Sequence, residues 1–481
     1  MPGFYGVRVT EKSTALTAPV IAETAVMAFG TAPVHQTGGP VNQIVTATSY
    51  EDAVKALGYS DDWGKYTLCE VIYSHFKLYG VAPLLLVNVL DPSQNKTAVA
   101  AANKAVTNGQ VELADDAIPA SVIVKASAES ETAATKGTDY DVFYQNGKCV
   151  VEVLSGGALA SASTLNIAYD KVTFALSDLT NAVIGGYDIA TGKSTGIELA
   201  DEAYFRTRII PDILIAPGFS HNTGVAAVLN AKAKTLSTVF RSFAVVDLPA
   251  NSATATYTAA VQAKDASGSF QSVKECVCWP MLKLDDKTFR FSTQMAGLMA
   301  QLSAQSGGVP SEPPSNKQLQ ADAAVLEDGT EIALDLTKAN HVRGQGLVTA
   351  FNFVDGFTSW GASCACAPGN SDPKDTYINT ARMMNYLANV CILTFWQYID
   401  RKMNSRLAGM ITDTLNFWIN GLTSQGHLLG GRCVLVAEEN PKTDLMAGIV
   451  RPHFYVGIPG PVQTIDFIVE YDPSYLSGVF S

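Results

Sequence analysis

The sequence predicts a multidomain protein of the α+β and α/β class. A layered α/β body is expected from segments typical of buried strands and amphipathic helices, which alternate over residues 20–94 and 200–345. Residues 95–199 hold short β-rich runs instead, which predicts an inserted all-β domain. Both chain ends alternate apolar and polar side chains, as strands with one buried face do. We therefore expect terminal β-strand arms at 1–19 and 462–481, and a C-terminal α+β domain over 346–461.

The composition excludes several classes of function. A formal net charge of -12 argues against nucleic acid as a direct partner, because phosphates require basic patches. The longest apolar runs, such as residues 81–90, are about half as long as a bilayer-spanning helix, so no membrane insertion is expected. The chain does not start with a basic and then apolar leader, which predicts synthesis in the cytoplasm. Hydrophobic residues make up 47% of the 481 residues, so we expect apolar surface between subunits.

The first part of the body is predicted to contain two strands and two helices. Residues 18–30 read as a buried strand. Ser49 is suited to cap a helix over residues 49–57, with Asp52 three positions on. A second amphipathic helix is expected over 66–79, and a central strand over 83–90. This compact unit ends at Asp91 and Pro92.

The inserted domain is predicted from four strand-like runs, at residues 120–126, 139–144, 148–153 and 165–169. Asn146 and Gly147 separate the middle two runs, and Asn-Gly accepts the positive φ of a tight hairpin turn. We expect this domain to face outward, since surfaces tolerate insertions best.

The body then resumes with alternating elements. Strands are expected at residues 211–216, 241–249 and 275–279, and helices at 223–236, 253–264 and 293–305. Pro313 and Pro314 interrupt any helix in the connector that follows. In the last third we expect a strand at 346–353, long helices at 375–403 and 405–422, and a strand at 432–438.

The two ends are the most informative part of the chain. An isolated strand exposes unpaired backbone groups that another chain can pair with, so two strand-like ends suggest strand exchange between copies. The alternative is that both ends pair inside their own sheet. The expected arm residues are Gly6, Val7, Arg8, Val9 and Thr10, with Ile465, Asp466, Phe467, Ile468 and Val469 at the other end. Flanking hinges are expected at Pro19, Gly457, Pro459, Gly460 and Pro461.

Cysteine pairs invite a metal hypothesis, which the spacing does not favour. Four thiolates from Cys276, Cys278, Cys364 and Cys366 could complete a tetrahedral zinc site. One intervening residue is fewer than zinc knuckles use, and it places both thiols of a pair on one strand face. We predict that these cysteines pack in the core. The six histidines are scattered without ligand spacing, so no metal or cofactor is expected.

No catalytic motif is complete. Residues 216–220 follow a strand and precede a helix, where α/β enzymes place phosphate loops or nucleophiles, yet they match neither G-x-S-x-G nor G-x-G-x-x-G. The acidic pairs at 285–286 and 438–439 lack a second converging group. We predict that the protein is not an enzyme; the alternative is a cytoplasmic α/β enzyme with a site near Ala216 to Gly218.

A set of motifs, each weak alone, resembles the contractile-tail sheath family of bacteriophages and related injection machines. In the body these are Gly185, Gly186, Tyr187, Asp188, Thr191, Gly192, Thr195, Gly196, Ala216, Pro217, Gly218 and the run Pro313, Pro314, Ser315, Asn316. The last third adds Trp360, Gly361, Tyr377, Ile378, Asn379, Arg382, Asn404, Leu422, Gly426 and Gly430. The resemblance spans nearly the whole chain outside residues 95–180. It departs at Thr380 and Ala381, where the family often carries paired arginines.

The resemblance implies a structural role. Sheath subunits form a helical homopolymer of stacked hexameric rings around a tail tube protein, and contraction drives the tube through the target envelope. Other implied partners are baseplate and tail terminator proteins, and the implied location is the tail of a virion or injection particle. The arms would add strands to a neighbour's sheet while the bodies rotate. The helix carrying Asp375, Tyr377, Asn379 and Arg382 is the candidate to face the tube. A non-contractile self-assembling shell is the alternative.

Overall fold

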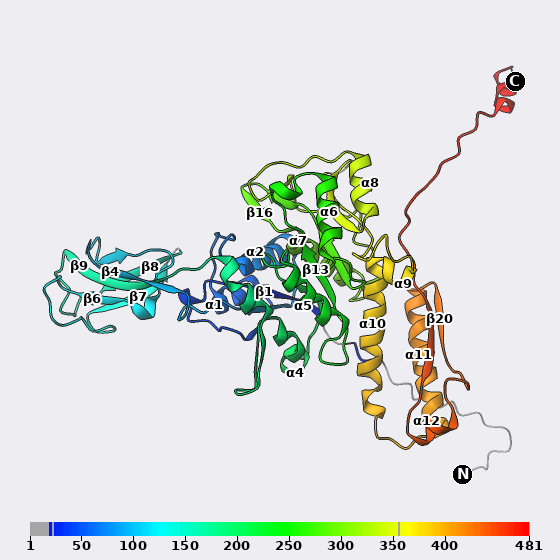
Figure 1. Cartoon of the computed structure of the whole chain (residues 1–481), viewed down its shortest axis with the longest axis horizontal. Helices are drawn as coiled ribbons and strands as arrows, with labels where there is room; N and C mark the ends of the chain where they lie inside the picture. The colour runs from blue at the N-terminus through cyan, green and yellow to red at the C-terminus, as the bar shows by residue number, and fades with distance from the viewer. Residues whose placement is uncertain (1–18, 22–23, 146, 355, 481) are drawn as a thin grey trace, which may run out of the picture.

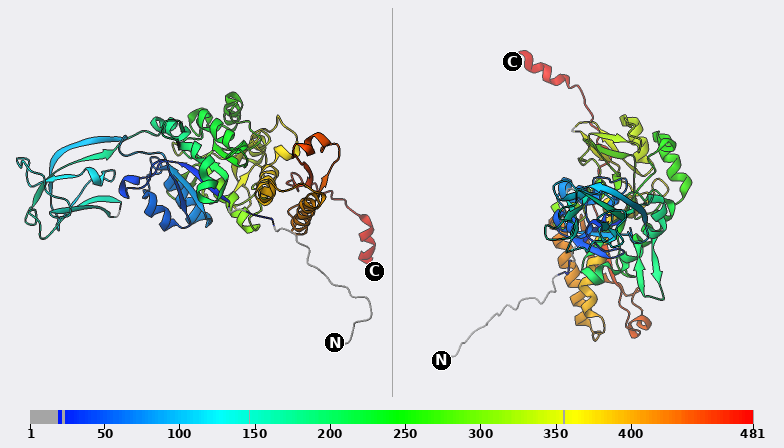
Figure 2. Two further views of the ribbon diagram at one scale, coloured as in Figure 1. Left: turned by 90° about the horizontal axis from the view of Figure 1, so that it is seen from below. Right: turned by 90° about the vertical axis from the view of Figure 1, so that its left-hand side faces the viewer.

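The structure is a computed structural model, described here for residues 19–21, 24–145, 147–354 and 356–480. It is elongated, with the α/β body between two smaller parts (Figures 1 and 2). The inserted domain lies at one end of the long axis, and the C-terminal helices with their hairpin lie at the other. The predicted mixed α/β class is confirmed.

An eight-stranded sheet forms the centre of the body, in the order β19-β18-β14-β13-β12-β1-β3-β2. Its strands are β1 (Thr24–Gly30), β2 (Ile44–Ala47), β3 (Leu84–Asn88), β12 (Ile210–Ile215), β13 (Phe243–Asp247), β14 (Glu275–Cys278), β18 (Leu347–Asn352) and β19 (Phe357–Trp360). Pairing is parallel from β3 to β18 and antiparallel at both edges. Parallel strands covered on both faces form nearly continuous apolar runs, and every residue of β3 and β13 is buried, including the polar Asn88 and Asp247 at their ends.

Helices pack on this sheet and fill the main core. They are α1 (Tyr50–Leu57), α2 (Thr67–Tyr73), α3 (Thr180–Ile184), α4 (Ala203–Thr207), α5 (Thr223–Lys234), α6 (Tyr257–Ser267), α7 (Phe291–Gln305) and α8 (Leu336–Gly344). The hydroxyl of Ser49 accepts a bond from the Asp52 amide, as its predicted capping role requires. Smaller sheets join β10 (Gly186–Asp188) to β11 (Lys193–Thr195), and β15 (Met281–Leu284) to β16 (Lys287–Phe289) and β17 (Ala323–Val325).

The inserted domain has two three-stranded sheets, β4-β9-β6 and β5-β8-β7, around a core of its own. The strands are β4 (Lys96–Ala105), β5 (Gln110–Glu112), β6 (Ile123–Lys125), β7 (Tyr140–Gln145), β8 (Lys148–Val153) and β9 (Thr164–Val172). Gln145 pairs with Lys148, and Gly147 has a φ of 76°, so the predicted hairpin turn lies where expected. Val172, Leu179 and Ile197 already belong to the main core, so the body resumes before residue 200.

The C-terminal domain contains α9 (Pro373–Thr376), α10 (Ile378–Phe395), α11 (Ser405–Ser424), β20 (Gly430–Leu435), α12 (Lys442–Met446) and β21 (Pro452–Gly457). A third core joins α10 and α11 through Leu387, Leu415 and Trp418. The expected start at 346 differs from the structure, because β18 pairs with β14 and extends the body's sheet. Helix α10 ends at Phe395, before the predicted residue 403, and a short 3-10 turn follows.

Candidate functional site

The C-terminal arm leaves the domain and extends away from it (Figure 1). Its described residues 458–472 form no helix or strand. The side chains of Phe467, Ile468 and Val469 are 86%, 95% and 92% exposed, and Ile465 and Asp466 are also exposed. The alternative that this end pairs inside its own sheet does not hold in this structure. Gly6 to Thr10 of the other arm lie outside the described residues.

The base of the C-terminal arm is held by the start of α10. Asn379 Nδ2 donates to the carbonyl oxygen of Pro459 at 3.0 Å, and the Tyr377 ring lies against Gly460. Farther on, Arg343 Nη2 donates to Gln463 Oε1 at 2.7 Å. The predicted hinge from Gly457 to Pro461 is therefore anchored, and the arm leaves the domain only after Gln463.

The base of the N-terminal arm is held by the other end of the same helix. The amide of Val20, next to the predicted hinge residue Pro19, donates to Thr394 Oγ1 at 2.9 Å. Thr394 lies 15 positions after Asn379, which is about 22 Å along an α-helix. Both arms are thus attached to α10, near its opposite ends.

The hairpin of β20 and β21 is a candidate receiver for a strand. The two strands pair antiparallel from Gly430 opposite Gly457 to Leu435 opposite Pro452. They form a sheet of two strands, so among the described residues neither outer edge is paired. One face packs on α11, where Asn416 exchanges hydrogen bonds of 3.0 and 2.7 Å with the Cys433 backbone. On β20, Asn416 already binds the outward N–H and C=O of Cys433. The outward backbone groups of β21 are the ones that another chain could pair with.

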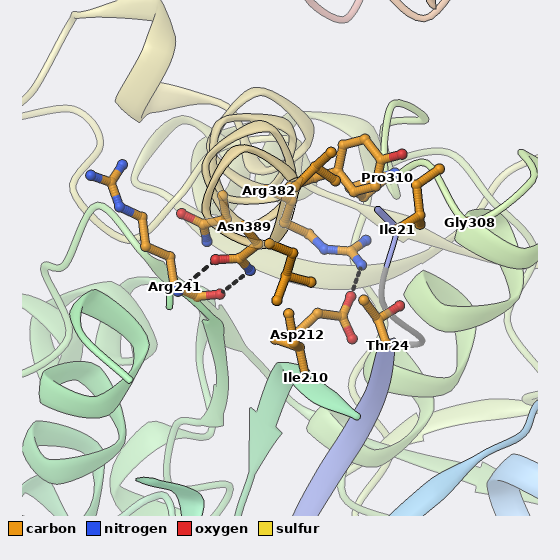
Figure 3. A pocket seen from close by; sticks show the side chains of 13 residues that line it. Ile21, Thr24, Ile210, Asp212, Arg241, Gly308, Pro310, Arg382 and Asn389 are labelled. Carbon is orange, nitrogen blue, oxygen red and sulfur yellow. Dashed lines mark hydrogen bonds and ion pairs between the residues drawn. The ribbon is translucent and has the colours of Figure 1, made fainter. Parts of the chain in front are cut away.

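The body-facing side of α10 is a row of polar side chains bound to the body (Figure 3). Arg382 Nη2 lies 2.9 Å from Asp212 Oδ2 on β12, and also donates to Ser303 Oγ at 3.1 Å. Asn385 donates to the Ser242 carbonyl at 2.7 Å. Asn389 donates to the Arg241 carbonyl at 2.8 Å and accepts from its amide at 2.9 Å. We call this row the α10 seam.

The burial of Asn379 and Arg382 corrects the prediction that these two residues face the tube. Their side chains are 1% and 4% exposed, because the charged and amide groups bind partners within the protomer. Asp375 and Tyr377 remain partly exposed. Sequence reasoning missed the partner of Arg382, because Asp212 is 170 residues away and follows no local spacing.

The electrostatics of the seam follow from its burial. Desolvation raises the pKa of Asp212, and the neighbouring Arg382 guanidinium opposes that rise. A stronger case lies in the body, where burial raises the pKa of Glu275 to about 7 although Asn230 donates to its carboxyl. Both groups are structural, since each is bound inside the protein.

The position suggested for an enzyme site lacks catalytic geometry. Gly218 follows β12 and lines a cavity of about 300 Å³ together with Asp247, His221 and Arg290. Ser220 is fully buried and bonds Asp247 directly at 3.2 Å, while His221 is exposed, so no base stands between hydroxyl and carboxylate. These residues tie the ends of β12 and β13 together.

The two cysteine pairs pack in the core as predicted. Cys276, Cys278, Cys364 and Cys366 all belong to the main core. Burial raises the pKa of Cys278 and Cys364 well above the ordinary value, which keeps these thiols protonated. Within the described residues, no group of three or more His, Cys, Asp or Glu is placed to hold a metal ion. Likewise, none of the helices there has the length and apolar character needed to cross a membrane.

Comparisons with known proteins agree on one family. No family model matches the chain. The tail sheath protein of Burkholderia phage BcepMu is 26% identical over 493 residues, covering 98% of this chain and 97% of that protein. The contracted PVC sheath of an extracellular contractile injection system aligns with a TM-score of 0.60 at 13% identity, covering 99% of both chains. The contracted helical sheath of the anti-feeding prophage aligns with a TM-score of 0.56 at 11% identity, covering 98% and 99%.

These relatives are tail sheath proteins, and the similarity to them supports a structural sheath subunit rather than an enzyme. The phage relative also supports a location in the tail of a particle. The similarity in sequence covers nearly the entire chain, and the fold agrees over the same length. The resemblance to the contractile-tail sheath family is therefore confirmed.

Proposed function

We infer that this chain polymerises as stacked hexameric rings around a tail tube and contracts to drive the tube through a target envelope. The observation that carries the inference is that one protomer has two surfaces without a partner, the C-terminal arm and the edge of the β20–β21 sheet. An apolar arm lies exposed, and within the described part of the chain no further strand pairs with either edge of the β20–β21 sheet. Adding the arm of one copy to the sheet of the next completes both by β-augmentation.

The energetics favour such an exchange. Ile465, Phe467, Ile468 and Val469 are between 69% and 95% exposed in the protomer. Burying a large apolar side chain contributes about 1.5–3 kcal/mol, so one arm could contribute several kcal/mol before the entropy of ordering it is subtracted. Backbone hydrogen bonds to β20 or β21 would add register and direction.

The shape of the protomer suggests a radial arrangement. The inserted domain and the C-terminal domain lie at opposite ends of the long axis (Figure 1). With the inserted domain outward, α10, α11 and the hairpin lie nearest the tail tube protein. Asp375 and Tyr377 stay candidate tube contacts, while Asn379 and Arg382 do not. Baseplate and terminator proteins would meet the two ends of the polymer.

Contraction needs no bound nucleotide on this proposal. The bodies would rotate into larger and better matched contacts, and the arms would keep neighbours connected. Because the C-terminal arm is anchored up to Gln463, we expect the change in backbone angle to occur just beyond that residue. A non-contractile shell would use the same strand exchange but show one polymer length only.

Two deletions test the proposal by electron microscopy. The full chain is expected to form long hollow tubes in extended and contracted forms. Removing residues 464–481, or separately residues 2–10, should leave a folded protomer and no tubes, because each removes one linking strand. Tubes that form and contract normally without these residues would disprove the arm exchange. A full chain that stays monomeric would disprove the sheath function itself.

A further inference from the structure

An apolar pocket lies at the far end of the C-terminal domain. It has a volume of about 550 Å³ and lies where α10 ends, α11 begins and β21 starts. Apolar side chains such as those of Phe395, Tyr398, Leu407 and Phe454 form most of its lining, together with Asp400 and Arg401. Ile399 and Met403 at its rim are 64% and 41% exposed. Clustered exposed apolar side chains of this kind mark a binding surface.

The chain carries a segment suited to such a pocket. After the arm, Pro473–Phe480 forms a short 3-10 helix, and its Tyr475 and Leu476 are 83% and 54% exposed. In its own protomer this segment lies away from the domain, beyond the end from which the arm leaves (Figure 1). The pocket lies at the other end, beside α12. A second copy is therefore a suitable source of the occupant.

Strand direction connects the two features. β21 runs from Pro452, which lines the pocket, to Gly457, at the base of the arm. An arm added antiparallel to β21 would run toward Pro452. Residues 465–469 would cover about 17 Å of this six-residue strand, which is about 20 Å long. The next three residues would span about 10 Å and bring Tyr475 and Leu476 to the pocket.

We propose that this pocket receives the C-terminal segment Pro473–Phe480 of a second copy of the chain, whose arm pairs antiparallel with β21. The proposal rests on the strand exchange proposed above. It adds the register and direction of the exchanged strand, and the apolar contact that holds the end of the arm.

Disulfide trapping in assembled polymers tests the docking. Leu476→Cys is combined in turn with Ile399→Cys, Met403→Cys and Leu407→Cys, in a Cys391→Ser background because Cys391 also lines the pocket. The matched control joins Leu476→Cys to Ile189→Cys, since Ile189 is 89% exposed at the β10–β11 turn. After mild oxidation with copper-phenanthroline, non-reducing gels should show a ladder of disulfide-linked chains for the pairs at the pocket. The intensity of these bands should be at least tenfold higher than for the control pair.

The outcomes separate the two proposals. If tubes form and no rim pair exceeds the control, the docking is wrong and the sheath function stands. Disulfides confined to single chains would also overturn docking between copies. If the full chain forms no tubes, the sheath function fails, and the docking fails with it.

Discussion

Two sides of the C-terminal domain differ in how far one protomer completes them. On the α10 seam, Arg382, Asn385 and Asn389 each find a partner in the body. At the hairpin, no other described strand pairs with either edge, and on the arm Phe467 and Ile468 are almost fully exposed. The difference separates contacts that one chain completes from contacts that it leaves open. The completed contacts hold the domain on its body, and the open ones are those that our proposal assigns to exchange between chains.

The largest expected effect comes from breaking the arm as a strand. The combined change Phe467→Pro and Ile468→Pro removes amide donors that point to both sides of the arm. We expect no tubes by electron microscopy, and a thermal midpoint within about 2 °C of the parent, because these two residues are 86% and 95% exposed in the protomer. The same changes to Ala are the control and should preserve tubes. A large loss of protomer stability would show that the arm also serves its own chain.

Breaking the α10 seam should instead lower the stability of the protomer itself. Arg382→Ala leaves the partly buried Asp212 carboxylate without its partner, which should lower the free energy of unfolding by about 3 kcal/mol in urea titrations. The paired change Arg382→Met with Asp212→Leu removes both charges and should recover most of that loss. If Arg382→Ala unfolds at the parental urea concentration, the seam does not hold the domain.

Buried carboxyls of the body provide a pH test of the completed side. Folded Glu275 keeps its proton up to about pH 7, whereas an unfolded glutamate releases it near 4.3, because burial raises the pKa. Folding therefore binds a proton between these values, and the free energy of unfolding falls as pH rises through that window. Glu275→Gln should be more stable than the parent by up to about 3 kcal/mol at pH 8 and similar near pH 4.5. Equal pH profiles of the two proteins would contradict the shifted pKa.

The smallest effect compares two asparagines in matched positions. Asn389 bonds the Arg241 backbone across the seam, and Asn416 bonds the Cys433 backbone under the hairpin. Each change to Ala should cost about 1–2 kcal/mol of unfolding free energy, because two hydrogen bonds are lost. Asn416→Ala should also reduce the yield of tubes, measured by sedimentation, and Asn389→Ala should not. Equal tube yields would remove the distinction between the two sides.

Local patterns predicted much of the body. The apolar runs of β3, β12 and β13 are visible because parallel strands are buried on both faces. β4 was missed, because Lys96–Ala105 is rich in alanine and mostly exposed, without the alternation of a half-buried strand. The extent of α10 was also wrong, since the helix passes at Trp396 into a 3-10 turn and Ile399 then takes an extended ψ of 141°, which no periodicity indicates.

The candidate site was predictable only in part. The C-terminal arm shows as alternation in the sequence, whereas its anchor at Asn379 and the seam pair of Arg382 and Asp212 depend on contacts across 80 and 170 residues. Such contacts have no signature in one sequence. That is why two residues predicted to face the tube turned out to hold the domain together.

The attachment of both arms to α10 has a mechanical consequence. A pull on one arm and an opposing pull on the other would meet along the 15 positions from Asn379 to Thr394. Such a load would travel through the hydrogen-bonded backbone of one helix, parallel to its axis, and would bypass the sheet of the body. α10 would then carry tension between the two arms. The distance between the two attachment points is set by the length of the helix, at about 1.5 Å per residue.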